Sequence, residues 1–132
     1  MKTILLVDDD LAIYRSLGQR FSIFGYKIIL KPDAESALTA IREGNEVNIV
    51  VVDYQRMGMD GPDFLSALKK ISPAVPVIML SEHNSVETYL KSLSLGAFEY
   101  LNKPVEEKEL SRIVKAALAW SETTSHSVPV SL

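Results

Sequence analysis

The chain has 132 residues, the size of one ordinary domain with a single hydrophobic core. Hydrophobic residues make up 47% and charged residues 23% of the sequence, which is typical of a folded globular protein and argues against disorder. The formal net charge of -3 provides no basic surface for nucleic acid or an anionic membrane. The absence of cysteine excludes disulfides, thiolate catalysis and cysteine-bound zinc.

Membrane insertion and secretion are also disfavoured. No apolar run approaches the roughly 20 residues that span a bilayer, and the apolar run Ile4–Val7 is too short for a signal peptide. By default we expect a cytoplasmic protein that has no contact with a membrane and does not bind nucleic acid directly.

The first part of the chain alternates predicted strands with predicted helices. In chain order these are a strand at Thr3–Val7, a helix with the apolar stripe Ile13, Leu17, Phe21 and Phe24, a strand at Lys27–Leu30, and a helix with the stripe Ala34, Ala37, Leu38 and Ile41. Apolar residues three and four positions apart form one face of a helix. Gly25 and Gly44 follow the two helices at the position where glycine commonly ends a helix.

The second part continues the same alternation. It contains a strand at Asn48–Asp53, a helix that begins near Pro62 with Leu65, Leu68 and Ile71, a strand at Val75–Leu80, a helix with Val86, Leu90 and Leu93, a strand at Ala97–Leu101, and a helix with Leu110, Ile113, Val114 and Ala117 that runs to about Trp120. The first, third and fourth strands are apolar throughout, as in a parallel sheet covered on both faces. The pattern predicts one doubly wound α/β domain over residues 1–120. A polar tail at 121–132 lacks a helical period and is expected to be a frayed end or the start of a linker.

Polar side chains gather at the predicted carboxyl ends of the strands, which form the functional edge of an open parallel sheet. They are Asp8 and Asp9 after the first strand, Asp53 at the end of the third, Ser81 after the fourth, and Tyr100 and Lys103 at the fifth. Carboxylates without a Cys or His cluster favour Mg2+ over Ca2+, provided that waters and a phosphate complete the octahedron. A neighbouring lysine and hydroxyl suit a phosphoryl group, which a carboxylate could accept as an aspartyl-phosphate. Asp10, in contrast, is expected at the start of the next helix, where the helix dipole favours an acid.

The ordered set Asp8-Asp9, Asp53, Ser81 and Lys103-Pro104 resembles the receiver domain of two-component response regulators. Each motif alone is common, but the set in this order is specific, and the resemblance extends from Thr3 to about Trp120. It implies the flavodoxin-like doubly wound (βα)5 fold, with a five-stranded parallel sheet in the order 2-1-3-4-5 and helices on both faces. The segment Gly96–Pro104 resembles receivers of nitrogen-regulation-type activators.

The resemblance also implies roles for individual residues. Asp53 matches the phosphoacceptor, Asp8, Asp9, Asp53 and the backbone carbonyl of Gln55 match the Mg2+ ligands, Lys103 and Ser81 match the groups that contact the phosphoryl group, and Tyr100 matches the switch aromatic. The bond before Pro104 is cis in the family. Gln55 and His83 occupy positions that tune the approach of water, and we hypothesise that they set the lifetime of the phosphoryl bond.

By the same resemblance, the chain is a signalling domain that catalyses its own phosphorylation and dephosphorylation, and it is not an enzyme in the usual sense. The phosphoryl group would come from a sensor histidine kinase or a histidine phosphotransfer protein. Phosphorylation would then switch the face formed by the fourth helix, fifth strand and fifth helix, where Tyr89, Lys91 and Tyr100 are expected to be exposed. A downstream protein or output domain would bind there, and homodimerisation through this face is a further option.

One alternative remains open from the sequence, and a second is disfavoured by the spacing of the acids. The chain could be a pseudo-receiver that acts as an interaction module without phosphorylation, although such a module should have lost the acceptor or an acid, and neither is missing here. It could also be a phosphohydrolase with an aspartate nucleophile. Those enzymes carry a second aspartate two residues after the nucleophile, a place that Gln55 occupies after Asp53.

Overall fold

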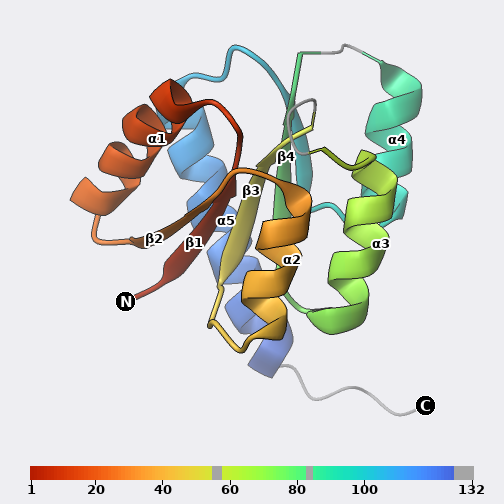
Figure 1. The fold of residues 1–132 in the computed structure, drawn as a ribbon, viewed down its shortest axis with the longest axis horizontal. Coiled ribbons are helices and arrows are strands. Elements are labelled where there is room, and N and C mark those ends of the chain that lie inside the picture. Colours follow the sequence, from red (N-terminus) through yellow and green to blue (C-terminus); the bar gives the residue numbers. More distant parts are fainter. Residues whose placement is uncertain (55–57, 83–84, 127–132) are drawn as a thin grey trace.

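Among the residues that the structure describes, five strands alternate with five helices (Figure 1). The computed structural model describes residues 1–54, 58–82 and 85–126. The strands are β1 (Thr3–Val7), β2 (Lys27–Lys31), β3 (Ile49–Asp53), β4 (Val77–Ser81) and β5 (Glu99–Asn102). The helices are α1 (Leu11–Ile23), α2 (Ala34–Arg42), α3 (Gly61–Ile71), α4 (Val86–Ser94) and α5 (Glu107–His126).

The strands form one parallel sheet in the order β2-β1-β3-β4-β5. Every residue of the three central strands β1, β3 and β4 is buried, which is why these segments are apolar nearly throughout. The edge strand β2 has no fully buried residue: Lys27 and Leu30 are exposed and the other three residues are half-buried. The predicted doubly wound fold and its strand order are therefore confirmed.

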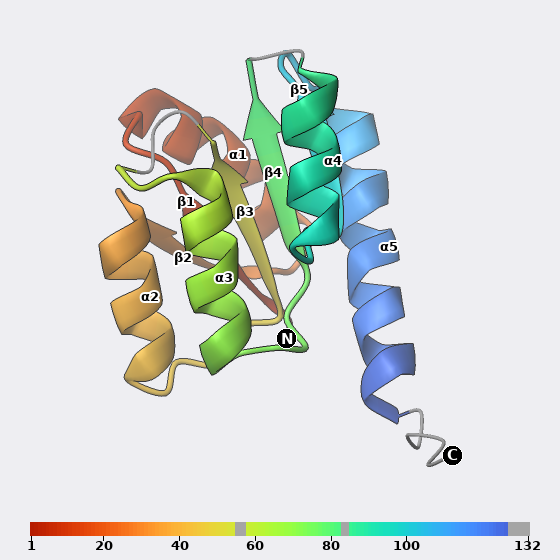
Figure 2. The same cartoon turned by 90° about the vertical axis from the view of Figure 1, so that its right-hand side faces the viewer.

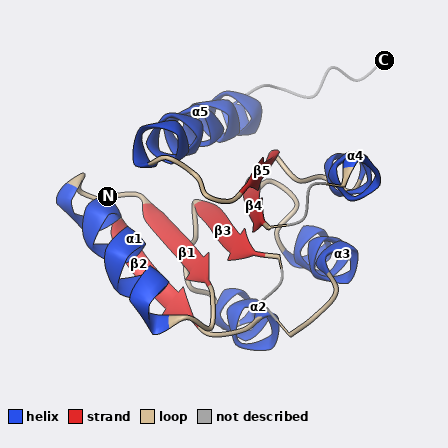
Figure 3. Ribbon diagram, turned by 90° about the horizontal axis from the view of Figure 1, so that it is seen from above, coloured by secondary structure: helices blue, strands red, loops and turns tan. Residues whose placement is uncertain are grey.

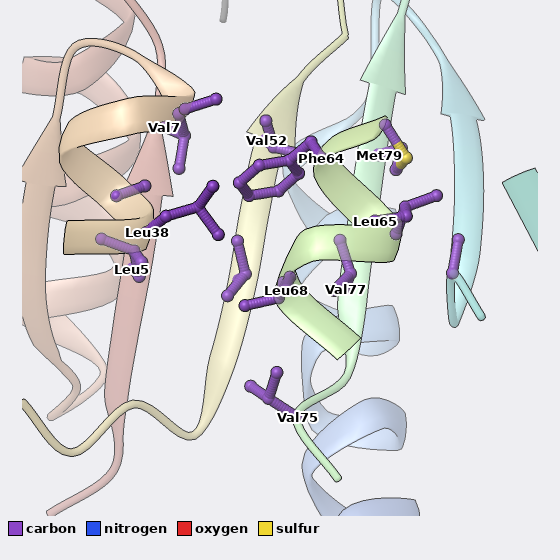
Figure 4. Close-up of a cluster of buried hydrophobic side chains, with 14 of the residues drawn as sticks. Leu5, Val7, Leu38, Val52, Phe64, Leu65, Leu68, Val75, Val77 and Met79 are labelled. Atoms are coloured by element: carbon purple, nitrogen blue, oxygen red, sulfur yellow. The ribbon is translucent and has the colours of Figure 1, made fainter. Parts of the chain in front are cut away.

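The helices cover both faces of the sheet, with α1 and α5 on one face and α2, α3 and α4 on the other (Figure 3). Alternate side chains of each central strand enter two separate hydrophobic cores, because successive residues of a strand point to opposite faces. Figure 4 shows the core under α2 and α3, in which Phe64, Leu65 and Leu68 pack near Val52 and Met79.

Helix α4 differs from the prediction in the face that it turns to the core. The expected stripe placed Val86, Leu90 and Leu93 inside. Leu93 does pack against the core, but the side chains of Val86 and Leu90 are 73% and 58% exposed. The buried residue of α4 is Ser92, with Thr88 and Leu93 half-buried. Small side chains let the helix lie close to its neighbours, and the larger aliphatic side chains are left in solvent.

Two further helix ends depart from expectation. Phe24, predicted to belong to the inward stripe of α1, lies at the C-cap of that helix with 54% of its surface exposed. Helix α5 continues beyond Trp120 to His126, so the first residues of the predicted tail are helical. Among the described residues, no helix has both the length and the apolar character needed to cross a bilayer.

The start of α2 provides a local test of stability. The Oδ1 atom of Asp33 accepts hydrogen bonds from the backbone N–H of Ser36 at 2.8 Å and from its hydroxyl at 2.7 Å. These bonds favour the ionised form and lower the pKa of Asp33 below its usual value. We expect Asp33→Ala to lower the free energy of unfolding by about 1 kcal/mol at pH 7.

Because the pKa of Asp33 is lowered in the folded state, its contribution is present above the unfolded-state pKa and is lost as the pH falls through the folded-state value. Urea unfolding between pH 7 and pH 3 should show that the difference in the free energy of unfolding between wild type and Asp33→Ala becomes smaller at the acidic end. Glu35→Ala, which removes an exposed acid in the same first turn, is the matched control. A gap that stays constant across this range would contradict the capping role.

Candidate functional site

Four polar side chains lie at the carboxyl ends of four adjacent strands. Asp53 and Ser81 are the last residues of β3 and β4, Asp8 directly follows β1, and Lys103 directly follows β5. The strand ladder continues past the last strand residues, because the N–H of Lys103 donates to the carbonyl of Ser81 at 2.7 Å. The sheet therefore brings residues that are far apart in sequence to one edge, at the top in Figure 1.

Lys103 and Asp53 form an ion pair at this edge. The Nζ atom of Lys103 donates to Oδ2 of Asp53. Asp53 is only 1% exposed and the Lys103 side chain 16%. An unpaired carboxylate at this depth would be costly, and the ammonium offsets part of that cost. The Lys103-Pro104 peptide bond is cis, as the resemblance implied.

Asp8 is the second buried carboxylate, with 2% of its surface exposed. Burial raises the pKa of Asp8 to about 6, and the neighbouring charge of Asp53 acts in the same direction. Two groups oppose this shift, namely the Asp10 backbone N–H, which donates to Asp8 Oδ1 at 2.8 Å, and the Lys103 ammonium. Among the described residues, Lys103 is the cation that acts on both buried carboxyl groups, so this part of the pocket favours an additional positive charge.

A divalent cation fits this donor set. Mg2+ commonly binds through one or two carboxylates and keeps several waters or phosphate oxygens in its shell, and Asp8 and Asp53 supply two such carboxylates. Asp9 is exposed beside them. Within residues 1–54, 58–82 and 85–126 no three acidic or histidine side chains converge as a metal-binding group. The role of Asp9 as a ligand therefore remains a prediction.

Asp10 belongs to α1 and not to the pocket. Its side chain accepts a hydrogen bond from the N–H of Ala12 at 2.9 Å and caps the first turn of the helix. Asp10 therefore lies at the helix start, as the sequence indicated.

Ser81 and Tyr100 complete the site on the side of β4 and β5. Ser81 is fully buried, and Tyr100 is 5% exposed. The expectation that Tyr100 is an exposed residue of the output face is therefore wrong, whereas Tyr89 and Lys91 are exposed. The ring of Tyr100 is buried because it packs in the core beneath α3 and α4.

Tyr54 is a residue of this site that the sequence reasoning missed. Its ring makes an edge-to-face contact with Tyr100, with ring centroids 6.1 Å apart. Burial raises the pKa of the Tyr54 phenol, and the nearby Asp60 adds to the effect. An aromatic residue directly after the acidic end of a buried strand was the available signal.

An open cleft of about 600 Å3 adjoins the ion pair. Its lining includes Ser16 and Leu17 of α1, Lys103 and Val105 after β5, and Leu110 of α5. Lys103 thus borders both the buried acids and a surface cleft wide enough to admit a side chain. The predicted tuning residues Gln55 and His83 lie outside the described residues.

The arrangement has a definite chemical capacity. A carboxylate held by an ammonium, beside a second acid that favours a cation, can accept an electrophilic phosphoryl group whose oxygens then meet positive charge.

The chain also resembles known proteins. The family model described as "Response regulator receiver domain" matches residues 4–115. The transcriptional regulatory protein ZraR of Salmonella typhimurium is 32% identical over 126 residues, which are 96% of this chain and 28% of ZraR. The DNA-binding transcriptional regulator NtrC of a Bradyrhizobium species is 38% identical over 117 residues, covering 89% of this chain and 24% of NtrC.

Solved structures give the same result. A CheY-like response regulator receiver domain protein from Methanospirillum hungatei superimposes with a TM-score of 0.87 at 32% identity, covering 94% of this chain and 98% of that one. The match therefore covers nearly all of this receiver structure (98%), but only about a quarter of ZraR (28%) and NtrC (24%).

Proposed function

Because the chain belongs to the family of response regulator receiver domains, we propose that it accepts a phosphoryl group on Asp53 from the phosphohistidine of a sensor histidine kinase or a histidine phosphotransfer protein. The observation that carries this proposal is the buried pair of Asp53 and Lys103 beside Asp8. An Asp53 oxygen attacks phosphorus, the P–N bond of the donor breaks, and the imidazole nitrogen keeps the electron pair and takes up a proton.

The other residues act on the charge that moves with the phosphoryl group. Lys103 would exchange part of its contact with Asp53 for a phosphoryl oxygen, and the hydroxyl of Ser81 would donate to another. Bound Mg2+ would neutralise charge on the phosphoryl oxygens. Hydrolysis reverses the modification, because water attacks phosphorus and releases inorganic phosphate while the Asp53 carboxylate is restored.

The output surface in this proposal is the face made by α4, β5 and α5. Figure 2 shows α4 and α5 on either side of β5. The outer side of α4 exposes Val86, Tyr89 and Leu90, an apolar set that a protein partner could cover. The partner is a downstream protein, an output domain of a longer chain such as those of the transcriptional regulators ZraR and NtrC, or a second copy of this domain.

Intact mass spectrometry tests the phosphoacceptor directly. The protein is incubated with acetyl phosphate and Mg2+, and we expect one added phosphoryl group on the wild type and none on Asp53→Asn. Asp63→Asn, an exposed acid of α3, is the matched control and should be modified like the wild type. Chelation of Mg2+ should prevent the modification. No adduct on the wild type would overturn the proposal in favour of a phosphorylation-independent interaction module.

A further inference from the structure

Three tyrosines from three different elements form a continuous row of rings on one side of the sheet. The Tyr100 ring contacts Tyr54 at 6.1 Å between centroids and Tyr89 at 6.0 Å, with interplanar angles of 70° and 87°. Tyr54 directly follows the last residue of β3, Tyr100 lies in β5 and Tyr89 in α4. The row therefore connects the residue after Asp53 to the outer helix of the proposed output face.

The register places this row beside Ser81. Val52, Met79 and Tyr100 are directly paired across β3, β4 and β5. Tyr54 and Ser81 lie two residues beyond Val52 and Met79, so they share the same face of the sheet. The Tyr54 N–H donates to the Leu80 carbonyl at 2.7 Å, which keeps Tyr54 in line with the strand. Tyr54 and Tyr100 thus flank the strand that ends in Ser81.

The backbone at the start of α3 limits where the Tyr54 ring can lie. A Cβ atom on Gly61 would be 2.2 Å from Cε2 and 2.7 Å from Cδ2 of Tyr54, far inside van der Waals contact. Gly61 is therefore the residue that leaves room for the ring in its contact with Tyr100. Any side chain at this position would displace the ring.

Both contacts of Tyr100 fall within the favourable range for aromatic pairs, with centroids 4.5 to 7 Å apart and edges directed at faces. We propose that Tyr54 is a positioning residue that holds Tyr100 in its buried position before any phosphoryl group is present, with Gly61 providing the space for its ring. The inference rests on the proposed function in one respect, namely that Tyr100 responds to the state of Asp53. In the chain without a phosphoryl group, the contact with Tyr54 thus raises the population of the buried position of Tyr100 relative to the outward one.

The test observes Tyr100 in protein that has not been phosphorylated. All five tyrosines are labelled with 3-fluorotyrosine, their 19F resonances are assigned by Tyr→Phe variants, and a soluble gadolinium chelate reports the exposure of each ring. We expect the Tyr100 resonance to be protected in the wild type. Tyr54→Leu removes one edge-to-face contact and should shift the ratio of buried to outward Tyr100 by roughly 2- to 12-fold. Gly61→Ala should act in the same direction, because it displaces the ring without deleting it.

Two controls separate positioning from general loss of structure. Tyr54→Phe keeps the ring and should leave Tyr100 as protected as in the wild type. Tyr26→Leu removes a matched pair elsewhere, since Tyr26 and Phe21 lie 6.1 Å apart at 73°, and it should not affect Tyr100. The Tyr26 resonance in Tyr54→Leu and Gly61→Ala reports whether these variants remain folded. Unchanged protection of Tyr100 in both folded variants would overturn the inference.

A second measurement distinguishes this inference from the proposed function. With beryllofluoride and Mg2+ added as a phosphoryl mimic, Tyr54→Leu should show a larger gain of Tyr100 protection than the wild type, because more of the ring population starts outward. If acetyl phosphate does not modify the wild type, the phosphoacceptor proposal fails, and the measurement without phosphodonor still decides the role of Tyr54. If acetyl phosphate modifies the wild type but the protection of Tyr100 is the same with and without the Tyr54 ring, only the present inference fails.

Discussion

Replacing Lys103 with methionine is expected to slow phosphoryl uptake at Asp53 by roughly 100-fold or more and to lower the free energy of unfolding by about 3 kcal/mol at neutral pH. Methionine keeps much of the lysine stem but removes the ammonium that donates to Asp53. The buried carboxyls of Asp53 and Asp8 then face each other without that counter-charge. The rate of mass increase with acetyl phosphate measures the first effect, and urea unfolding measures the second.

Lys108→Met is the matched control, because Lys108 is an exposed lysine in the first turn of α5. It should change neither the uptake rate nor the stability appreciably. Adding Mg2+ should recover part of the stability lost in Lys103→Met, since a divalent cation replaces the missing positive charge. Uptake by Lys103→Met at the wild-type rate would show that the ion pair has no part in the transfer.

Asp8→Asn is expected to make the protein more stable without Mg2+ while removing its response to the ion. The raised pKa of about 6 means that the folded chain opposes ionisation of Asp8, so the charge costs up to about 3 kcal/mol above that pH. Asparagine carries no charge and keeps an oxygen that can accept the Asp10 N–H. Urea unfolding at pH 7.5 should therefore give a higher free energy of unfolding for Asp8→Asn than for the wild type. Saturating Mg2+ should narrow or reverse this difference.

The sign of the pH dependence follows from the direction of the shift. Between the unfolded-state value of 3.8 and about 6, the folded wild type binds more protons at Asp8 than the unfolded chain does, so this group makes stability fall as the pH rises. The stability that Asp8→Asn gains over the wild type should thus be small at pH 4 and reach its full value above pH 6. Asp10→Asn is the control, because asparagine caps a helix as well as aspartate does. An Asp8→Asn variant that Mg2+ stabilises like the wild type would refute the ligand role of Asp8.

The sequence predicts the central part of this structure well because burial leaves few choices there. The apolar segment that ends in Asp53 fits a strand covered on both faces, and the parallel order then brings Asp53 near Asp8 and Lys103. The capping role of Asp10 was also predictable, because an acid before a helical pattern has a local reason to be there. The sequence also predicts Val75 in a strand, but its carbonyl accepts a hydrogen bond from the Lys69 ammonium at 2.7 Å and the strand begins at Val77.

The features that sequence reasoning missed depend on which surfaces meet. Spacing showed that α4 is amphipathic, but a pattern does not state which of two stripes faces the core, and the larger side chains of Val86 and Leu90 proved to be outside. The contact of Tyr54 with Tyr100 joins residues 46 positions apart and requires an exact clearance at Gly61. Residue types and the periodicity of apolar residues do not specify a contact distance between segments that are far apart in sequence.

The exposure of Val86 and Leu90 on α4 affects the energetics of partner binding. Helix α4 packs on the domain through small and half-buried side chains, so the hydrophobic effect contributes little to holding it there. Local opening of α4 should therefore require less free energy than local opening of α3, which buries Phe64, Leu65 and Leu68. A partner that covers Val86 and Leu90 supplies the apolar contact that the domain itself omits. Partner affinity and the local stability of α4 are then thermodynamically linked. A partner that binds only the docked helix stabilises it against opening, and opening of the helix lowers the apparent affinity by the fraction of molecules in which it is open.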